Sequence, residues 1–482
     1  MLATPYNKEN ILIDLINIVG KENVTIEECD LVCYEKDYSL ISDLVQIKPD
    51  FVVHPETTEH VLEIVRLANR WKIPVVPRGG GTGMWGGAIP SDGGIVLDMR
   101  KMDRIINVDE EKRTVTVQSG VLVRNLANYL EKRGFFVADK PESWFAATVG
   151  ARTQGNGIGY YYNSRFGQST DQVICLEVVL PTGEVIRTGP LKVYDPASGY
   201  DFTSLFSNAE GTLGIITQVT LRIYKLPERR VVEIFEFPSY KSMIEAVMAI
   251  RDSGLIPETL ETMDRTNYQS YSQNAYRVLA SNERVSKYGG VMVIGYAGID
   301  KLIGSQIEVT QDICNRFEGN LTPNSFVETW KRLKEAYPVN PFPIHTALMS
   351  KPVKYVLDAI VPLESTTGLI EVYHNLVDKY GIVSHGIAAV HCAPDFHSIV
   401  YAKAYVDERE EKEIDTVRKI EDELYNYVKN VDGGIGGFGG IGISRLRYGE
   451  DQYGSTLNLA KKLKQTFDPN NIINPGKKFK VN

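Results

Sequence analysis

The sequence predicts a protein of mixed helices and strands that is divided into two domains. Its 482 residues exceed the size, roughly 250 to 300 residues, at which a single hydrophobic core stops growing. The first half contains a β-α-β pattern that leads into a glycine-rich loop, whereas helical and strand-like stretches alternate after Pro227 without further glycine signatures of that kind. We therefore expect a first domain over residues 1–227 and a second that begins at residue 228.

Composition excludes several classes of protein. The apolar fraction of 43% and the charged fraction of 24% are those of an ordinary soluble globular protein, and no apolar run approaches the ~20 residues of a membrane span. A net charge of −8 without a basic block argues against nucleic acid as the main partner. The amino terminus has no signal-peptide pattern, so we expect a cytoplasmic protein. The five cysteines form no Cys-x-x-Cys pair, and any redox centre must therefore be a bound cofactor.

The first elements in the chain lead to the glycine loop. Helix-like patterns cover Asn10 to Val19 and Ser39 to Leu44, and a strand begins at Phe51. A helix with an apolar stripe then starts near Thr57, a residue type that favours the N-cap position. A second strand over Pro74 to Val76 completes the β-α-β unit.

The loop that follows combines closely spaced glycines with a return to strand. Residues 79–83 read Gly-Gly-Gly-Thr-Gly, and consecutive glycines allow a concave group of backbone N–H donors that suits a pyrophosphate. A P-loop would need Lys-Ser or Lys-Thr here, and a Rossmann loop would open a helix, but this loop leads into the strand Ile95 to Met99. A side chain at Gly80 is expected to enter the space of the pyrophosphate. The alternative to a phosphate-binding loop is a glycine-rich surface loop without a ligand.

The remainder of the first half is rich in strands. Strand patterns at 104–107 and 114–118 flank a charged turn, and a helix from Val121 ends at Gly134. Residues 141–171 carry few periodic apolar positions, and a connection of that length inside a domain predicts a functional loop. A hairpin over 173–187 and a long alternating strand after Gly214 close this half.

Taken together, these segments resemble the flavin domain of the family of vanillyl-alcohol oxidase and para-cresol methylhydroxylase, which includes D-lactate and glycolate dehydrogenases. The resemblance covers Pro49 to Lys225 and the carboxyl-terminal Phe467 to Lys477. It implies an α+β fold with a two-subdomain FAD-binding domain of the para-cresol methylhydroxylase type and an α+β cap, or substrate, domain. The cap would span residues 228–430, and residues 431–482 would return to the FAD domain.

The resemblance also implies which residues contact FAD. The pyrophosphate would lie against the glycine loop, and further contacts would come from the 141–155 segment, the start of the last strand and the carboxyl-terminal motif. The implied contacts are Pro77, Arg78, Gly79, Gly80, Gly81, Thr82, Gly83, Gly86, Pro141, Glu142, Thr148, Gly150, Gly155, Glu210, Gly214, Ile215, Ile216 and Asn474. Because Arg78 stands where some family members attach the flavin through histidine, we expect non-covalent FAD.

The motifs of the 2-hydroxy-acid branch are altered in this chain. The paired histidines of the metal motif correspond to His391 and His397, which are one residue closer together than the motif requires. Phe438 and Gly439 stand where the branch has Glu and His, and neither offers a metal ligand. We therefore expect no catalytic metal. In Trp330-Lys-Arg-Leu, the arginine that would hold a substrate carboxylate has become Leu333 or has moved to Arg332.

The candidate catalytic residues are therefore His391, His397, Arg332 and Tyr160. A histidine can act as a base, although a lone histidine is more often a structural residue. Tyr160 could offer a phenolate or a stacking face, although aromatic runs more often serve packing. His345 and His385 are further candidates of the same kind.

These features predict an FAD-dependent oxidoreductase that oxidises a small hydroxylated substrate. The leading hypothesis is a 2-hydroxy acid of the D-lactate or glycolate type, with hydride transfer to flavin N5. The alternatives are a phenol or alcohol oxidase of the vanillyl-alcohol oxidase type and a non-catalytic flavoprotein subunit of an electron-transfer complex. A separate electron acceptor is expected, whether oxygen, a quinone, a cytochrome or an electron-transfer protein, and a homo-oligomer is left open.

Overall fold

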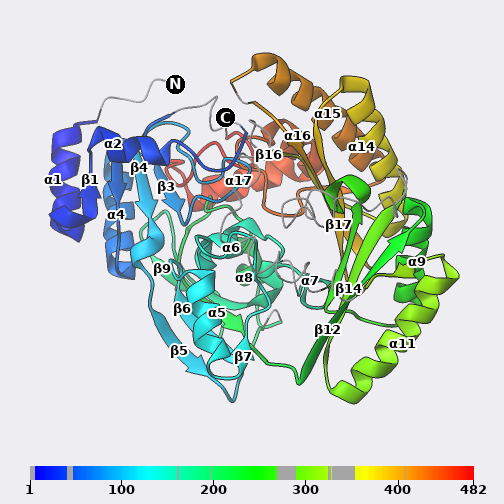
Figure 1. Ribbon diagram of the computed structural model, residues 1–482. Coiled ribbons are helices and arrows are strands. Elements are labelled where there is room, and N and C mark those ends of the chain that lie inside the picture. Colours follow the sequence, from blue (N-terminus) through cyan, green and yellow to red (C-terminus); the bar gives the residue numbers. More distant parts are fainter. Residues whose placement is uncertain are drawn as a thin grey trace.

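The computed structural model describes residues 6–40, 47–159, 162–195, 197–268, 289–323, 327, 353–407 and 409–481. In this part of the chain the strands form a four-stranded, a five-stranded, a two-stranded and an eight-stranded sheet. The two smaller multi-stranded sheets lie at the left and lower centre of Figure 1, and the eight-stranded sheet with its helices lies at the right. The predicted helix over Ser39 to Leu44 falls largely on residues 41–46, which lie outside the described residues.

The amino-terminal lobe is a small sheet with helices against it. Its strands run in the order β1-β2-β4-β3, and β4 is parallel to both β2 and β3. The side chain of Thr57 accepts a hydrogen bond from the backbone N–H of His60 at 3.2 Å, which confirms the predicted N-cap. The elements of this lobe are α1 (Lys8–Val19), β1 (Val24–Thr25), α2 (Glu28–Leu31), β2 (Phe51–Val53), α4 (Thr58–Trp71), β3 (Val75–Arg78) and β4 (Ile95–Asp98).

The second lobe is built on an antiparallel sheet with the order β5-β6-β10-β8-β9. The predicted hairpin over 173–187 is present as β8 and β9, and the predicted long strand is β10. The elements are β5 (Ile105–Asp109), β6 (Thr114–Gln118), α5 (Val123–Glu131), β7 (Phe135–Phe136), α6 (Val149–Gly155), α7 (Asn163–Phe166), β8 (Val173–Val179), β9 (Val185–Arg187), α8 (Phe202–Phe206), β10 (Ile215–Arg222) and β11 (Tyr224–Lys225).

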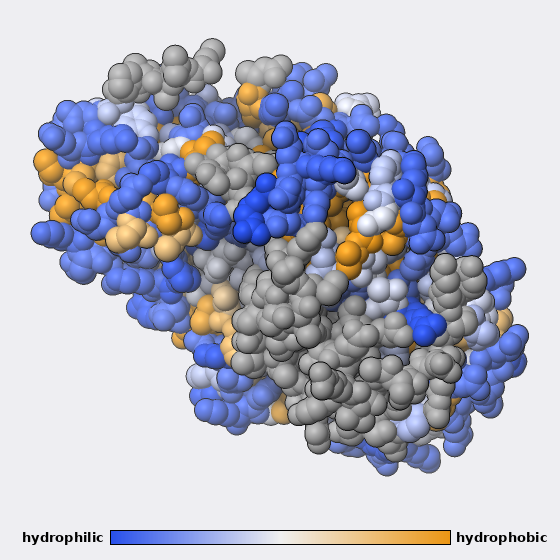
Figure 2. Space-filling model, turned by 45° about the horizontal axis from the view of Figure 1, so that its top comes forward, coloured by the Kyte–Doolittle hydropathy of each residue, from blue (hydrophilic) through white to orange (hydrophobic). Residues whose placement is uncertain are grey.

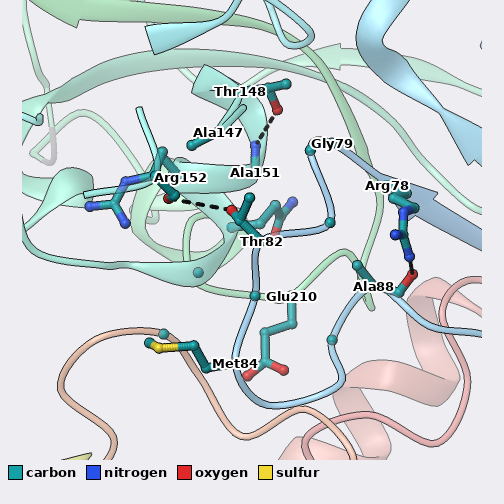
Figure 3. Close-up of a pocket in the computed structure, with 18 of the residues that line it drawn as sticks. Arg78, Gly79, Thr82, Met84, Ala88, Ala147, Thr148, Ala151, Arg152 and Glu210 are labelled. Atoms are coloured by element: carbon teal, nitrogen blue, oxygen red, sulfur yellow. Dashed lines mark hydrogen bonds between the residues drawn. The ribbon is translucent and has the colours of Figure 1, made fainter. Parts of the chain in front are cut away.

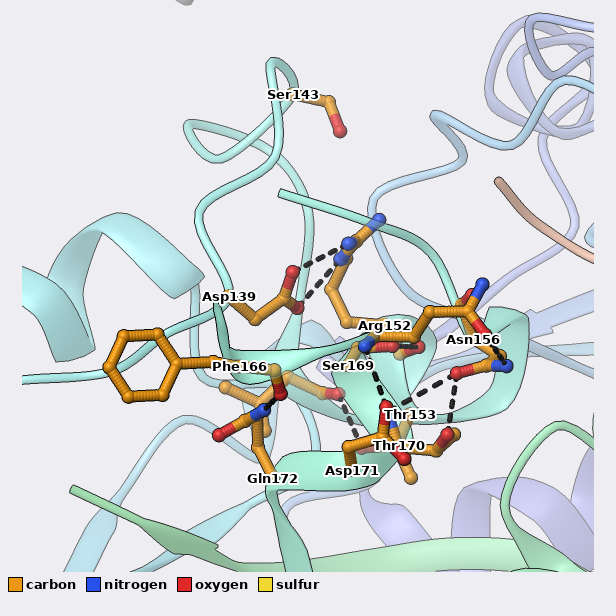
Figure 4. Close-up of polar contacts among 12 residues, drawn as sticks. Asp139, Ser143, Arg152, Thr153, Asn156, Phe166, Ser169, Thr170, Asp171 and Gln172 are labelled. Carbon is orange, nitrogen blue, oxygen red and sulfur yellow. Dashed lines mark hydrogen bonds and ion pairs between the residues drawn. The ribbon is translucent and has the colours of Figure 1, made fainter. Parts of the chain in front are cut away.

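The segment 141–171, predicted as a functional loop, contains two short helices, α6 and α7. The side chain of Thr148 caps α6 by accepting a hydrogen bond from the N–H of Ala151. Polar side chains tie the helix to the chain on both sides of it. Arg152 forms a two-pronged ion pair with Asp139, which precedes the helix (Figure 4), and Asn156 donates to Gln168, which follows it, at 2.9 Å. Polar contacts of this kind leave no apolar periodicity, so the sequence pattern could not reveal these helices.

The eight-stranded sheet occupies the second half of the chain. Its strand order is β15-β12-β14-β13-β17-β18-β16-β19. The predicted helices around 243–250 and 369–377 and the predicted strands at 231–237, 290–296 and 399–406 are all present. The elements are β12 (Arg229–Phe237), α9 (Tyr240–Asp252), β13 (Thr259–Asp264), β14 (Gly290–Gly298), α11 (Asp300–Arg316), β15 (Asn320–Leu321), β16 (Val353–Val361), α14 (Thr366–Tyr380), β17 (Ser384–Cys392), β18 (His397–Tyr405), α15 (Glu411–Asn430) and β19 (Gly434–Ile435).

The two faces of this sheet have different partners. Helices α9, α11, α14 and α15 cover one face, and their buried residues form one continuous core with alternate strand residues such as Ala389 and Val400. The intervening residues, such as Val390 and Ile399, pack instead with Ile158 of the second lobe. Because side chains alternate along a strand, each residue of the central strands faces either the helices or the lobes. We call the second face the lobe-facing side of the sheet.

After β19 the chain returns to the lobes. Helices α16 (Leu446–Tyr453) and α17 (Leu457–Phe467) lie between the lobes and the sheet (Figure 1). Beyond them the backbone brackets β3, because Val75 N–H donates to the carbonyl of Ile472 at 2.7 Å and Asn474 N–H donates to the carbonyl of Val75 at 2.8 Å. The strand β19, which follows residue 431, still pairs with β16.

Figure 2 shows a largely hydrophilic face with apolar side chains gathered over the amino-terminal lobe, where Ile13, Ile26 and Val32 are exposed. Every helix in the described ranges is too short or too polar to cross a membrane.

Candidate active site

A cavity lies where the glycine loop, helix α6 and the lobe-facing side of the sheet meet. Figure 3 shows the side of the cavity that the glycine loop and α6 form. Most of the residues that the sequence assigned to the cofactor line this cavity. They are Pro77, Arg78, Gly79, Gly80, Gly81, Thr82, Gly83, Pro141, Glu142, Thr148, Gly150, Gly155, Glu210, Gly214, Ile215 and Ile216. Gly86 and Asn474 do not line it. Residues as far apart in the sequence as Pro77 and Ile216 thus line one cavity, as a long extended ligand would require.

The glycine loop connects β3 to β4, so it lies between two strands as predicted. Three of its glycines are required by close packing. A Cβ atom on Gly79 would overlap the hydroxyl of Thr148, one on Gly80 would overlap the carbonyl oxygen of Ala146, and one on Gly81 would overlap the guanidinium of Arg78. The expectation that a side chain at Gly80 would enter the ligand space is therefore wrong, because that position faces the 141–148 segment.

Other glycines keep the cavity open. A Cβ on Gly83, Gly155 or Gly439 would meet no atom closer than 3.7 Å, and all three residues line the cavity. Side chains at these positions would therefore occupy ligand space rather than the protein interior. This cradle fits FAD, whose phosphates need backbone donors and whose chain needs close approach to the backbone.

Arg78 supports the glycine loop from behind. Its guanidinium donates to the carbonyl oxygens of Lys36 at 2.7 Å and Ala88 at 3.1 Å, and Figure 3 shows the second of these bonds. It also lies over the ring of Tyr34, and burial lowers the pKa of the guanidinium. The side chain of Arg78 is therefore held in place by contacts within the protein.

Glu210 fixes a second glycine-rich segment, residues 436–442, which we call the carboxyl-terminal loop. Its carboxylate accepts hydrogen bonds from the backbone N–H groups of Ile441 and Gly442, each at 2.7 Å, and contacts Lys478 at 3.2 Å. The backbone of Glu210 is left-handed, with φ of +52°, and its carbonyl accepts from Asn474. Asn474 thus acts behind the cavity wall, which corrects its predicted place at the ligand.

The other end of the carboxyl-terminal loop is held by the eight-stranded sheet. Asp358 on β16 accepts hydrogen bonds from the N–H groups of Gly437 and Phe438 at 2.7 and 2.8 Å. Arg445 donates to Asp358 at 2.8 Å, and its guanidinium stacks 3.2 Å above the centre of the Trp85 ring. No local pattern in the sequence indicates this arrangement, because its members come from three distant segments.

The structure corrects the assignment of the two histidines. Neither His391 nor His397 is among the residues that line the cavity. His391 is completely buried on the helix-covered face of the sheet, where its ring contacts the hydroxyls of Thr262 at 2.8 Å and Ser398 at 3.0 Å. Burial lowers its pKa to about 3. His397 pairs with Asp395 at 2.8 Å.

The physical reason is the alternation of side chains along β17. Val390 and Cys392 belong to the lobe-facing side, so His391 between them must face the helices. His385, a further candidate, is also fully buried. Tyr160, Arg332 and His345 lie outside the described residues. In the described ranges, no three His, Cys, Asp or Glu side chains are grouped so as to hold a metal ion.

Two cavity-lining side chains from the sheet were missed by sequence reasoning. Lys403 on β18 and Tyr355 on β16 are directly opposite each other in the strand pairing, and both line the cavity. The alternation on β18 could have indicated this, because Ile399, Tyr401 and Lys403 share one face. An isolated lysine in a strand pattern carries no functional signal without the position of its neighbours.

Two protein-family models match this chain. The first, described as an FAD binding domain, matches residues 49–189, and the second, the C-terminal domain of FAD linked oxidases, matches residues 226–478. The second match alone covers more than half of the chain. The protein therefore belongs to the FAD-linked oxidases of the vanillyl-alcohol oxidase and para-cresol methylhydroxylase family, which confirms the predicted family and enzyme class.

Particular relatives include enzymes of 2-hydroxy acids. The chain is 29% identical to glycolate oxidase subunit GlcD of Bacillus subtilis (strain 168), over 96% of each chain. It is also 29% identical to the mitochondrial D-lactate dehydrogenase [cytochrome] of Arabidopsis thaliana, over 97% of this chain and 79% of that protein. An enzyme of this family transfers electrons from its substrate to FAD and needs an acceptor to remove them.

Solved structures confirm the predicted fold class. The 4-ethylphenol oxidase from Gulosibacter chungangensis, in complex with isoeugenol, matches with a TM-score of 0.82 at 17% identity over 99% of both chains. Substrate-bound p-cresol methylhydroxylase matches with a TM-score of 0.78 at 18% identity, over 98% of this chain and 96% of that one. At these identities the likeness concerns the fold alone.

Proposed function

We propose that this protein oxidises a small 2-hydroxy acid, of the D-lactate or glycolate type, with FAD as the first electron acceptor. The observation that carries the proposal is that Lys403, a cationic side chain of the sheet, lines the same cavity as the glycine cradle. A small acid held between the two would meet a cation on one side and the cofactor on the other. The relatives named above support the same substrate class.

The residues of the cradle have distinct roles toward the cofactor. Backbone N–H groups of residues 79–83 would hold the phosphates, and Gly155 and Gly439 would leave room for the rest of the molecule. When bound, FAD supplies the hydride acceptor for the carbon that carries the hydroxyl group. The buried side chains of Phe438 and Ile158 would keep water out of the reacting region.

The function is tested by anaerobic reduction of the bound flavin. We expect D-lactate or glycolate to bleach the flavin absorbance near its visible maximum, and the rate to be unchanged after dialysis against EDTA. A para-alkyl phenol serves as the comparison substrate. Bleaching by the phenol alone would instead support the alternative of a phenol oxidase. No bleaching by any of these substrates would indicate a non-catalytic flavoprotein, and loss of activity that zinc or manganese restores would indicate a metal site.

We further propose that the flavin is bound without a covalent link. The family resemblance places Arg78 where some members attach the flavin through histidine, and its guanidinium is bonded to backbone carbonyls. His397 pairs with Asp395 and is not among the cavity-lining residues. We expect acid precipitation to release intact FAD into the supernatant, as measured by its fluorescence before and after phosphodiesterase treatment. Yellow colour that stays with the washed pellet would contradict this.

A further inference from the structure

The lobe-facing side of the sheet carries a cluster of charged and phenolic side chains opposite the glycine cradle. Tyr355 and Lys403 line the cavity, and Tyr401, which is next to them on the same face, is completely buried. The hydroxyl of Tyr401 donates to the carboxylate of Glu261 on β13 at 2.9 Å. Glu142, from the 141–148 segment, closes the cluster from the side of the lobes.

Lys403 is the centre of this cluster. Only 2% of the residue is exposed, although it carries an ammonium group that is costly to bury without compensation. Its Nζ lies 4.7 Å from the centre of the Tyr355 ring and 5.1 Å from that of Tyr401, so two aromatic faces stabilise the charge. The carboxylate of Glu142 is 3.9 Å away. Both residues line the cavity, and at that distance they are ion-paired without a hydrogen bond between them.

The other cations of the cavity wall belong to the two lobes. Of the described lining residues, only Arg78, Arg152 and Lys403 are cationic. Arg78 donates to backbone carbonyls behind the glycine loop, and Arg152 forms its two-pronged pair with Asp139 at 2.6 and 2.8 Å (Figure 4). Lys403 differs from both because it projects from the sheet, across the cavity from the cradle.

We propose that the ammonium group of Lys403 binds the carboxylate of the substrate and thereby selects for acids over neutral alcohols. This inference rests on the proposed oxidation of a 2-hydroxy acid. Tyr355, directly opposite Lys403 in the strand pairing, places its ring against the lysine ammonium group. Lys403 is thus a binding and specificity residue of the active site.

The test compares Lys403→Met with Lys403→Arg in the FAD-loaded full chain. The matched control is Lys354→Met, because Lys354 is a buried lysine on the neighbouring strand that does not line the cavity. Two readouts are used: the dissociation constant of oxalate, measured from the perturbed flavin spectrum, and the second-order rate of flavin reduction by D-lactate compared with the uncharged D-lactamide.

We expect Lys403→Met to weaken oxalate binding and slow reduction by D-lactate by about a hundredfold, because a buried charge contact is lost. The rate with D-lactamide should be unchanged, and so should the FAD content. Lys403→Arg should recover part of the affinity, and Lys354→Met should behave as the wild type. A merely structural role for Lys403 would instead lower both rates equally.

The outcomes separate the two proposals. Unchanged oxalate binding in Lys403→Met, an equal loss for D-lactate and D-lactamide, or no oxalate binding by the wild type would overturn the role of Lys403. The oxalate titration needs no turnover, so it judges Lys403 on its own. Failure of the wild type to be reduced by any 2-hydroxy acid would overturn the proposed function, whatever the titration shows.

Discussion

Replacing Gly80 with valine is expected to yield a protein that retains no FAD through purification. The new Cβ would overlap the carbonyl oxygen of Ala146 and lie 2.6 Å from its carbonyl carbon. Ala146 cannot move easily, because its N–H and that of Ala147 both donate to the carbonyl of Ser143. The glycine loop must therefore shift, and overpacking of at least about 3 kcal/mol corresponds to a loss of FAD affinity of about a hundredfold or more.

The measurement is the ratio of flavin to protein absorbance, followed by titration of the apoprotein with FAD. The control is Gly304→Val in α11, where an added Cβ meets no atom within 4 Å. Circular dichroism should show that both variants are folded. A Gly80→Val protein with the wild-type flavin content would mean that the cradle tolerates the shift.

This site shows what the sequence could and could not predict. The glycine loop, its position between two strands and most cavity-lining residues follow from local patterns, because turns, strands and helix caps depend on neighbouring residues. The contact between Gly80 and Ala146 depends on tertiary packing, so the direction of the missing Cβ was predicted wrongly. The helix α6 was hidden for a similar reason, since polar contacts with residues such as Asp139 hold it in place.

Replacing Arg445 with methionine is expected to destabilise the protein by about 3–5 kcal/mol, because it leaves the carboxylate of Asp358 buried without its cationic partner. Arg445 is 1% exposed, and it also donates to the carbonyl of Gly440 at 3.1 Å and stacks on Trp85. The loss should appear as a lower midpoint of denaturant unfolding and as release of FAD at a lower temperature.

Two variants show whether the charge is responsible. Adding Asp358→Asn to Arg445→Met should recover part of the lost stability, since the amide oxygen can still accept from the N–H groups of Gly437 and Phe438. The exposed pair of Arg229 and Asp300 provides the comparison, and Arg229→Met should change the free energy of unfolding by no more than about 1 kcal/mol. An equal loss of unfolding free energy in Arg445→Met and Arg229→Met would show that burial of the ion pair is not the cause.

His391 and Lys403 of the eight-stranded sheet show a second limit of prediction from sequence, which concerns the two faces of a strand. His391 drew attention in the sequence because histidine is a common catalytic residue, and Lys403 did not because isolated lysines usually lie on the surface. A sequence shows which residues alternate along β17 and β18 but not which face meets the cavity. Which face meets the cavity depends on the helices that cover the other face. As a result, His391 lies under the helices and Lys403 faces the cradle.

The backbone bonds between Val75 and residues 472–474 affect when the protein can acquire its cofactor. The strand β3, which delivers the glycine loop, is paired with residues that the ribosome adds almost a whole chain later. The hydrogen bonds of Glu210 likewise cannot form until Ile441 and Gly442 have been synthesised. The cradle is therefore incomplete on a nascent chain, and flavin loading should follow the synthesis of these residues. Nonsense variants that end before residue 472 should accumulate as colourless protein even when they retain every residue of the glycine loop.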